Sequence, residues 1–346
     1  MNRSVSQNAK PQKVVSPWPH RLAVVMVCAT FPLIWVGGLV TTYDAGMAVP
    51  DWPSTYGYNM FLYPLSTWWG APWDLFIEHG HRLLASGVGM LVIAFVVVVW
   101  RKDSRPVMRW WSFVCLALVL LQGGIGGMRV LLDEVTLARL HGCLGPVFFA
   151  SCVVAAVMTS KWWRNVEPMA TSETRSFQRF ALATLGIAYL QLVLGSHLRH
   201  LPASWEPSMF MVVVVAHLVV AVVLFAYCSM LVFLAARKKQ IRRTRVLTRP
   251  SLCLALLVSM QLVLGVGAWA VKYAWPQWLP GGGLWANYTV QAESMIQGLT
   301  VTGHVALGSA ILATATLIAV RSSRLCYSSG TSLTTAKTRE LWECVT

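Results

Sequence analysis

Long apolar stretches, separated by short polar ones, follow each other along most of the chain. Eight of them reach the length of about 20 residues that a helix needs to cross a bilayer. They lie at roughly 22–40, 82–100, 110–128, 141–160, 178–197, 209–235, 251–271 and 299–320. This pattern predicts an all-α membrane protein with eight transmembrane helices.

The composition supports a lipid environment. Hydrophobic residues make up 56% of the 346 residues and charged residues 12%, whereas a soluble globular chain is about 25% charged. The first apolar stretch is long and follows a polar, basic lead, so we expect a true span and not a cleaved signal peptide.

The basic residues are sorted by side of the membrane. The formal net charge is +15, and 23 of the 28 lysines and arginines lie in the tails or in the connections after even-numbered spans. The other five are Arg82, Arg129, Arg139, Arg199 and Lys272. Because connections rich in Lys and Arg stay in the cytoplasm, we expect both termini there. The basicity then reflects topology, and the expected partner is the lipid bilayer and not nucleic acid.

None of the eight cysteines falls in an outer connection, so we expect no disulfide.

The chain is expected to contain two similar halves, because a polar connection at 161–177 divides the spans four and four. On three odd-numbered spans a glutamine precedes a glycine by four residues, and every even-numbered span carries a histidine near its outer end. These residues are Gln122–Gly126, Gln191–Gly195 and Gln261–Gly265, and His81, His141, His217 and His304. Both halves enter from the same side, so we expect two pseudo-symmetric four-helix bundles related by an axis along the membrane normal.

The expected organisation follows from these boundaries. It comprises a cytoplasmic lead at 1–21, an N-terminal half at 22–160, a cytoplasmic linker at 161–177, a C-terminal half at 178–320 and a cytoplasmic tail at 321–346.

The four histidines are the main candidates for function, because an ionisable side chain within a span is costly to bury. For one such histidine, a hydrogen bond between helices is the simpler explanation. Four at equivalent positions favour haem, since neutral imidazole binds iron and two facing histidines can take both axial positions. One pair per half predicts two haem sites. The glycines of the repeat would let a flat macrocycle approach the backbone, although close helix packing explains them equally well.

Glu78 precedes His81 by three residues and Arg82 by four, so the three lie on neighbouring faces of a helix. A carboxylate there can orient the imidazole or move a proton. The alternative is an exposed ion pair with Arg82, which contributes at most about 1 kcal/mol. His79 points about 200° away from His81, so the two cannot face one porphyrin.

Basic side chains at the outer interface are candidates for pairing with haem propionates. They are Arg82, Arg129, Arg139, Arg199 and Lys272. Snorkelling to the lipid headgroups is the alternative for each of them.

His197 and His200 end the fifth span, where helix capping and contact with a haem propionate are both open. Two long outer connections, 41–77 and 272–298, are rich in Trp, Pro and Tyr, which fits either an interfacial aromatic belt or a lid over a site.

Taken together, these residues resemble the haem A synthases of bacteria and mitochondria over nearly the whole chain. The first outer loop, from Gly37-Gly38-Leu39-Val40-Thr41 to Pro50-Asp51-Trp52-Pro53, looks like the loop of that family. The stretch Glu78-His79-Gly80-His81-Arg82 matches its Glu-x-x-His-Arg motif, which selects His81 over His79 as ligand. The other three histidines fall where the family has its own.

The resemblance implies a haem-dependent membrane oxidoreductase that serves cytochrome oxidase assembly. Such an enzyme oxidises the C8 methyl of haem O to the formyl of haem A, by hydroxylation, a second oxidation to a geminal diol and loss of water. It implies that His81 and His141 bracket the substrate haem O, and that His217 and His304 hold the iron of a haem b cofactor. Glu78 would be the catalytic acidic residue. A bacterial inner-membrane location, a membrane electron donor and hand-over of haem O by a haem O synthase are implied as well, and a homo-oligomer is open.

The first outer loop departs from the pattern of many bacterial members, which carry a cysteine pair there. The corresponding places here are Val49 and Ser54 or Thr55. The chain thus resembles a cysteine-free branch, in which we expect packing alone to hold the loop.

Two other functions stay open. Four histidines would serve equally well in a di-haem cytochrome b that only transfers electrons, and repeated halves also occur in transporters. Glu78 beside His81 and the close match of the first loop favour the synthase over the cytochrome. Few transporters carry four intramembrane histidines at one depth.

Overall fold

The computed structural model describes residues 16–200, 206–273 and 294–327 of the chain. In these ranges, eight helices are long and apolar enough to cross a membrane, which confirms the predicted spans. They are α1 (Trp18–Thr42), α3 (Trp73–Lys102), α4 (Pro106–Leu132), α5 (Val135–Thr159), α7 (Ser172–Arg199), α8 (Pro207–Arg237), α10 (Arg245–Tyr273) and α12 (Met295–Cys326). The protein is therefore an all-α, multi-pass membrane protein.

Within the described ranges, four short helices lie at the ends of the long ones. They are η1 (Ala45–Met47), α2 (Leu65–Trp69), α6 (Lys161–Asn165) and α9 (Lys239–Arg242). Helix α3 begins at Trp73, well before the predicted span at 82–100. Its polar first turns place Glu78, His81 and Arg82 on one continuous helix, as the motif requires.

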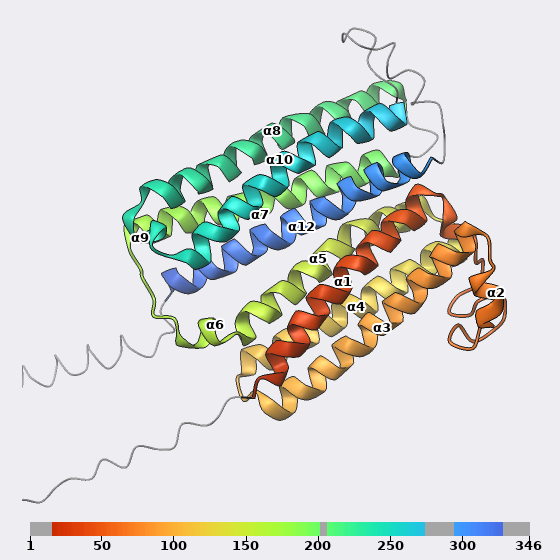
Figure 1. Cartoon of the computed structure of the whole chain (residues 1–346), viewed down its shortest axis with the longest axis horizontal. Helices are drawn as coiled ribbons and strands as arrows, with labels where there is room; N and C mark the ends of the chain where they lie inside the picture. The colour runs from red at the N-terminus through yellow and green to blue at the C-terminus, as the bar shows by residue number, and fades with distance from the viewer. Residues whose placement is uncertain (1–15, 201–205, 274–293, 328–346) are drawn as a thin grey trace, which may run out of the picture.

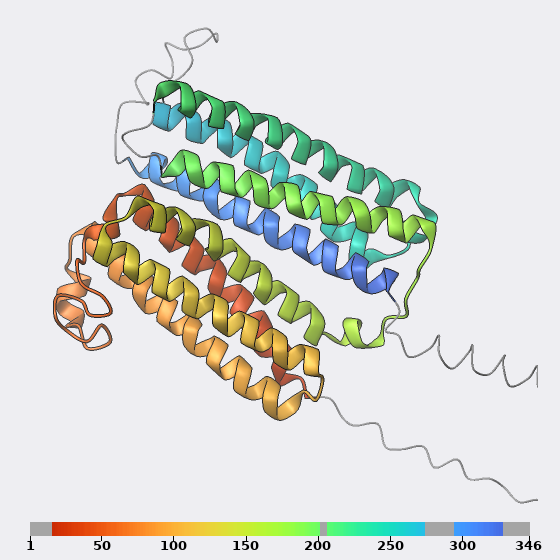
Figure 2. The same cartoon turned by 180° about the vertical axis from the view of Figure 1, so that it is seen from behind.

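The long helices form two groups of four (Figure 1). In the N-terminal group, each helix packs on two others in the cyclic order α1, α3, α4, α5, and the C-terminal group repeats this order as α7, α8, α10, α12. The groups meet where α12 packs on α1 and α5 and where α5 touches α7. Figure 2 shows the same contact from behind. The symmetry axis and the domain boundaries stay predictions.

Helices α5 and α12 form the centre of the molecule. More than half of the most apolar part of each is buried, 56% in both, against 11–28% in the other six long helices. Many large apolar side chains of the outer helices are exposed, among them Val222 at 68% and Val263 at 72%. Lipid is the solvent that suits such a surface. The two central helices carry His141 and His304.

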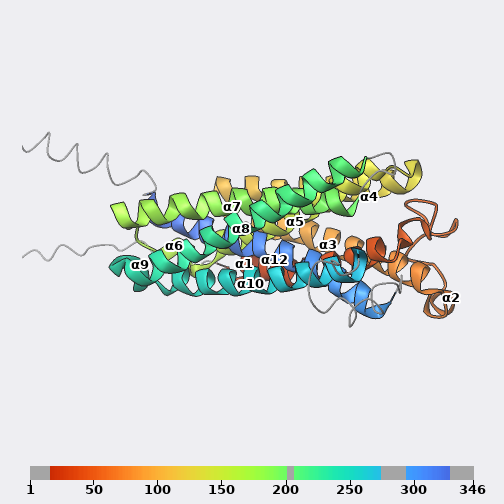
Figure 3. The ribbon, with the colours of Figure 1, turned by 90° about the horizontal axis from the view of Figure 1, so that it is seen from above.

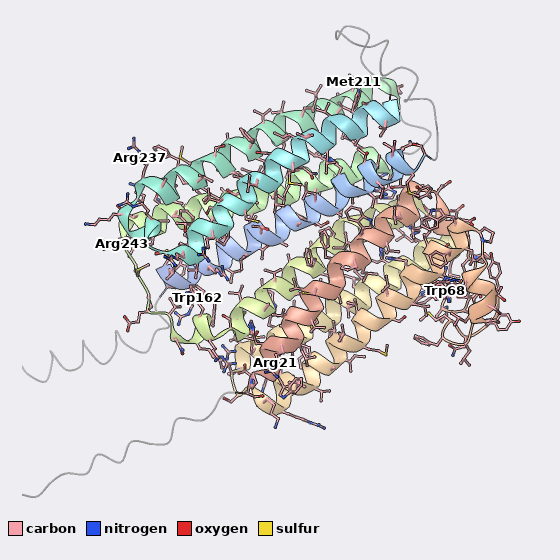
Figure 4. All side chains as sticks on the ribbon, in the orientation of Figure 1. Arg21, Trp68, Trp162, Met211, Arg237 and Arg243 are labelled. Atoms are coloured by element: carbon pink, nitrogen blue, oxygen red, sulfur yellow. The ribbon has the colours of Figure 1, made fainter. Side chains whose placement is uncertain are left out.

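The two ends of the bundle differ in chemistry. The long helices run side by side, with α6 and α9 towards one end and α2 at the other (Figure 3). Arg21, Trp162, Arg237 and Arg243 lie towards the α6 and α9 end, and Trp68 and Met211 towards the other (Figure 4). The charge pattern predicts this placing of the arginines of the tails and even-to-odd connections at one end of the bundle. Which end faces the cytoplasm stays a prediction.

Candidate functional site

The structure brings the four histidines together as two pairs, one in each half. The ring centres of His81 and His141 lie 6.4 Å apart, with an angle of 82° between the ring planes. The ring centres of His217 and His304 also lie 6.4 Å apart, at 63°. All four rings are half-buried. Each pair joins helices that are diagonal in the cyclic order of their half.

Each imidazole packs against a glycine of the neighbouring helix. A methyl group added at that glycine would lie 2.7–3.2 Å from the Cε1 atom of the ring. At Gly37 and Gly126 this is too close for a real contact, and at Gly195 and Gly265 it is tighter than most real contacts. The pairs are Gly37–His81, Gly126–His141, Gly195–His217 and Gly265–His304. The repeated glycines therefore make room for imidazole rings against the helix backbone.

The glutamines of the repeat contact the same histidines. Gln122 donates to the backbone carbonyl of His141 (3.0 Å), and Gln261 to that of His304 (2.9 Å). Gln191 Nε2 lies 3.2 Å from Nε2 of His217. The Oε1 atoms of these three glutamines are buried and have no hydrogen-bond partner among the described residues.

The residues present fit haem. Two imidazoles that bind one iron from opposite faces, each through a bond of about 2 Å, have ring centres roughly 6 Å apart. The described residues contain no group of three or more His, Cys, Asp or Glu side chains that could hold a metal ion. A pair of imidazoles suits an iron whose other four ligands come from a porphyrin.

Glu78 is buried, with 3% of its surface exposed, and both of its carboxylate oxygens are bonded. Oε1 accepts from Arg82 (2.8 Å) and Oε2 from the backbone N–H of Val49 (3.0 Å). The ion pair with Arg82 is therefore buried, which differs from the exposed pair considered as the alternative role of Glu78. The outer loop covers it.

Arg82 anchors the first outer loop. It donates to the backbone carbonyls of Asp51 (2.6 Å), Ser54 (2.9 Å) and Val49 (2.8 Å). Hydrogen bonds thus hold the loop, and the expectation that packing alone would do so was wrong.

His79 faces this loop and not the histidine pair. It is buried, its Nδ1 lies 3.0 Å from Oγ1 of Thr55, and its ring packs against Tyr63 and Trp68. Thr55 and Val49 stand where the resemblance places cysteines in other members. Both are fully buried here, and both are held by side chains of α3.

Within the loop, Asp51 accepts hydrogen bonds from the backbone N–H groups of Tyr56 (2.8 Å) and Gly57 (2.9 Å). Burial alone would raise the pKa of the Asp51 carboxyl, but hydrogen bonds from Gly57, Ser54 and Tyr56 outweigh it and lower that pKa. Trp52 is placed by this turn against Gly127 of α4, directly beside the glycine that packs on His141. The loop therefore connects the surroundings of His81 to those of His141.

The other basic candidates lie at the same end of the bundle. Arg139 donates to the carbonyl of His200 (2.9 Å), and Arg199 donates to Gly38 and Thr42 of α1 (2.6 and 2.8 Å). Nε of Arg139 and Nη1 of Arg199 are buried and lack a partner among the described residues.

Arg129 borders a pocket that Asp44, Gly46 and His200 also line. The side chain of Lys272 lies outside the described residues, as does most of the connection 272–298. His197 Nδ1 lies 2.9 Å from the carbonyl of Val193, a bond within its own helix. The propionate roles of the basic residues stay predictions.

Sequence reasoning missed the anchoring roles of Arg82 and His79 towards the loop. The loop partners of Arg82 are backbone carbonyls, which every residue carries, so no residue type reveals them. The partners of His79 are side chains that the chain brings together only on folding. The placement of Gly37 against His81 was also missed, because no glutamine stands four residues before it. The residue there is Leu33.

The chain is similar to several known proteins. Residues 71–211 match the family of the cytochrome oxidase assembly protein, a segment that contains Glu78, His81 and His141 but neither His217 nor His304. Among curated relatives, the "Heme A synthase" of Shouchella clausii is 25% identical over 193 residues, which are 55% of this chain and 62% of that protein.

Two further relatives carry the same name. The "Heme A synthase" of Exiguobacterium sp. is 23% identical over 256 residues, covering 68% of this chain and 77% of that protein. That of Brucella ovis is 32% identical over 150 residues, covering 41% and 40%. The chain spans 62% of the length of the Shouchella relative. The predicted resemblance to haem A synthases is confirmed, whereas the roles of the four histidines and of the first loop stay predictions.

Proposed function

Since this chain resembles the haem A synthase family in both comparisons, we propose that it is a membrane oxidoreductase of haem A biosynthesis. It converts the C8 methyl of haem O to the formyl of haem A, for use in cytochrome oxidase. One observation carries the proposal: each half holds two histidines with ring centres 6.4 Å apart, the spacing of two axial haem ligands.

The two sites have different roles in this proposal. Glu78 and Arg82 flank His81 in α3, whereas the corresponding neighbours of His217 in α8 are the apolar Val214 and Leu218. A charged, loop-covered pair suits a reacting substrate, and an apolar pair suits a resident cofactor. His81 and His141 therefore hold haem O, and His217 and His304 hold haem b.

Each group of residues has a task in the reaction. When bound, haem b supplies one-electron redox chemistry. The loop pinned by Glu78 and Arg82 closes the outer end of the N-terminal half and keeps water from the substrate. Glu78 is the acidic residue one turn from His81, where it can hold a proton at its carboxylate. A haem O synthase that delivers the substrate, a membrane electron donor and the bacterial inner membrane complete the proposal.

Coexpression with a haem O synthase, followed by pigment extraction, tests the activity. Haem A should appear only when both proteins are present. His217→Ala should abolish the low-spin haem b spectrum, because one axial ligand is lost. His20→Ala is the matched control, since His20 contacts Ala156 and Thr159 far from both pairs. A normal low-spin spectrum in His217→Ala would overturn the cofactor assignment.

A di-haem cytochrome b is the second candidate, favoured by the equal spacing of the two pairs. It predicts two low-spin haems and no haem A in the same extraction. Haem A formation that depends on Glu78 would exclude it.

A further inference from the structure

The two histidine pairs differ in what contacts their ring nitrogens. In the C-terminal half, Gln191 Nε2 lies 3.2 Å from Nε2 of His217, and Gln261 Nε2 lies 3.4 Å from Nε2 of His304. In the N-terminal half, the amide of Gln122 contacts the backbone carbonyl of His141 and not its ring. At the place on α1 that corresponds to Gln191, the chain has Leu33, which has no amide.

The Nε2 atom is the nitrogen that can face an iron. At His141, His217 and His304, Nδ1 lies nearer than Nε2 to the packed glycine, so Nδ1 faces the neighbouring helix. Nε2 has one lone pair, and a neutral imidazole carries its proton on only one nitrogen. The amide nitrogen of glutamine is a donor, so Nε2 accepts from it with the same lone pair that would bind iron. A glutamine hydrogen bond and an iron bond at Nε2 therefore exclude each other.

We propose that Gln191 and Gln261 gate the loading of the C-terminal pair, so that the two halves take up haem at unequal rates. The inference rests on the proposed function, in which both pairs bind haem. Haem reaches His81 and His141 without displacing a side-chain amide, whereas His217 and His304 become available only when the two amides turn away. Both glutamines are positioning residues that act through the imidazoles.

A backbone carbonyl offers these amides another hydrogen-bond acceptor. Gln261 already donates to the backbone carbonyl of His304 (2.9 Å), and Gln122 makes the same bond to His141 (3.0 Å). The Oε1 atoms of Gln191 and Gln261 have no partner among the described residues, so for Gln261 the bond to this carbonyl is the one other hydrogen bond there that holds the amide. The arrangement suits the proposed roles, because a substrate haem enters and leaves in every turnover and a cofactor haem loads once.

Rates of haem uptake test the gate. Full-length protein from haem-limited cells is mixed with ferric haem b, and the growth of the low-spin Soret band is followed by stopped flow. A His81→Ala background reports on the C-terminal pair and a His217→Ala background on the N-terminal pair. Gln191→Leu should speed loading of the C-terminal pair roughly five-fold, the factor for one hydrogen bond of about 1 kcal/mol.

Gln178→Leu is the matched control on the same helix, because the Gln178 amide donates to Ser323 (3.1 Å), and it should leave the rate at the C-terminal pair unchanged. The reciprocal variant Leu33→Gln should slow loading of the N-terminal pair, which keeps the test decisive if Gln191→Leu fails to fold. Histidine-dependent uptake at equal rates in all variants would overturn the gate and leave the proposed function standing. Wild-type protein that takes up no haem at either pair would overturn both.

Discussion

At the scale of single residues, Glu78 combines an acidic group with a structural role. A buried ion pair stabilises a fold only when its remaining hydrogen-bonding capacity is satisfied, and the pair with Arg82 meets that condition through Val49, Asp51 and Ser54. The same carboxylate stands one turn from His81. Substituting it therefore tests chemistry and loop anchoring together.

Glu78→Gln should abolish haem A formation and let haem O or a hydroxylated intermediate accumulate. The amide has one acceptor oxygen where the carboxylate has two, so either Arg82 or Val49 meets an N–H donor instead, at a cost of about 1–3 kcal/mol. Extracted pigments measure the first effect and proteolysis within residues 49–58 the second, while low-spin haem b should remain.

Glu134→Gln is the control, because Glu134 is an exposed acid at the same end of the bundle. Haem A at the wild-type level in Glu78→Gln would reject a catalytic role and leave Glu78 as an anchor of the loop.

Asp103 gives a pH dependence of known sign. It pairs with Arg105 (2.7 Å) and Arg164 (3.1 Å). Burial alone would raise the pKa of its carboxyl, but hydrogen bonds and the positive charge of Arg105, with the charge of Arg164, lower that pKa below the usual value. A group whose pKa falls on folding stabilises the protein above its unfolded pKa, and this contribution is lost as the pH drops through the folded pKa.

Asp103→Asn should therefore lower the Tm at pH 7, and the difference from wild type should shrink below about pH 4, near the unfolded pKa of aspartate. Thermal unfolding in detergent, followed by circular dichroism between pH 7 and pH 3, measures both effects. A Tm difference that is constant over this range would contradict the assignment.

At the scale of helices, the hydropathy pattern predicts which segments cross the membrane because lipid requires every turn of a span to be apolar outside and hydrogen-bonded inside. It could not predict the start of α3 at Trp73, because the first turns of that helix carry Asp74, Glu78 and Arg82. The glycines of the repeat were visible as a pattern. Their physical reason, room for an imidazole against the backbone, needed the packing of neighbouring helices.

Helix α4 offers a matched pair of glycines. At Gly126 an added methyl group would lie 2.9 Å from Cε1 of His141, whereas at Gly123 nothing lies within 4 Å. Gly126→Ala should shift the imidazole, destabilise the protein by about 1–3 kcal/mol and reduce haem binding by the N-terminal pair. Gly123→Ala should be neutral or stabilising by up to about 1 kcal/mol. Equal Tm values and equal haem content in the two variants would contradict the packing argument.

At the scale of the whole molecule, the two halves are in direct contact through one interface. Arg199 of α7 donates to Gly38 and Thr42 of α1, and Thr42 lies 3.0 Å from Thr302 of α12. Polar contacts of this kind fix the relative position of helices where lipid offers no hydrophobic driving force. Helices α5 and α12, which carry His141 and His304, both take part in this interface. A movement of one half against the other would therefore shift one histidine of each pair relative to its surroundings.

The orientation of the molecule in the membrane is the remaining large-scale prediction. The positive-inside rule puts the end with Arg21 and Arg243 in the cytoplasm and the first outer loop on the opposite side. Ser66 in α2 is exposed at the loop end and Arg243 is exposed at the basic end, so cysteines at these places report on opposite faces. In intact cells, an impermeant thiol reagent should label Ser66→Cys at once and Arg243→Cys only after the membrane is ruptured, with the unsubstituted chain as the blank for its native cysteines. The reverse order of labelling would show that the basic end does not face the cytoplasm and that the predicted orientation is wrong.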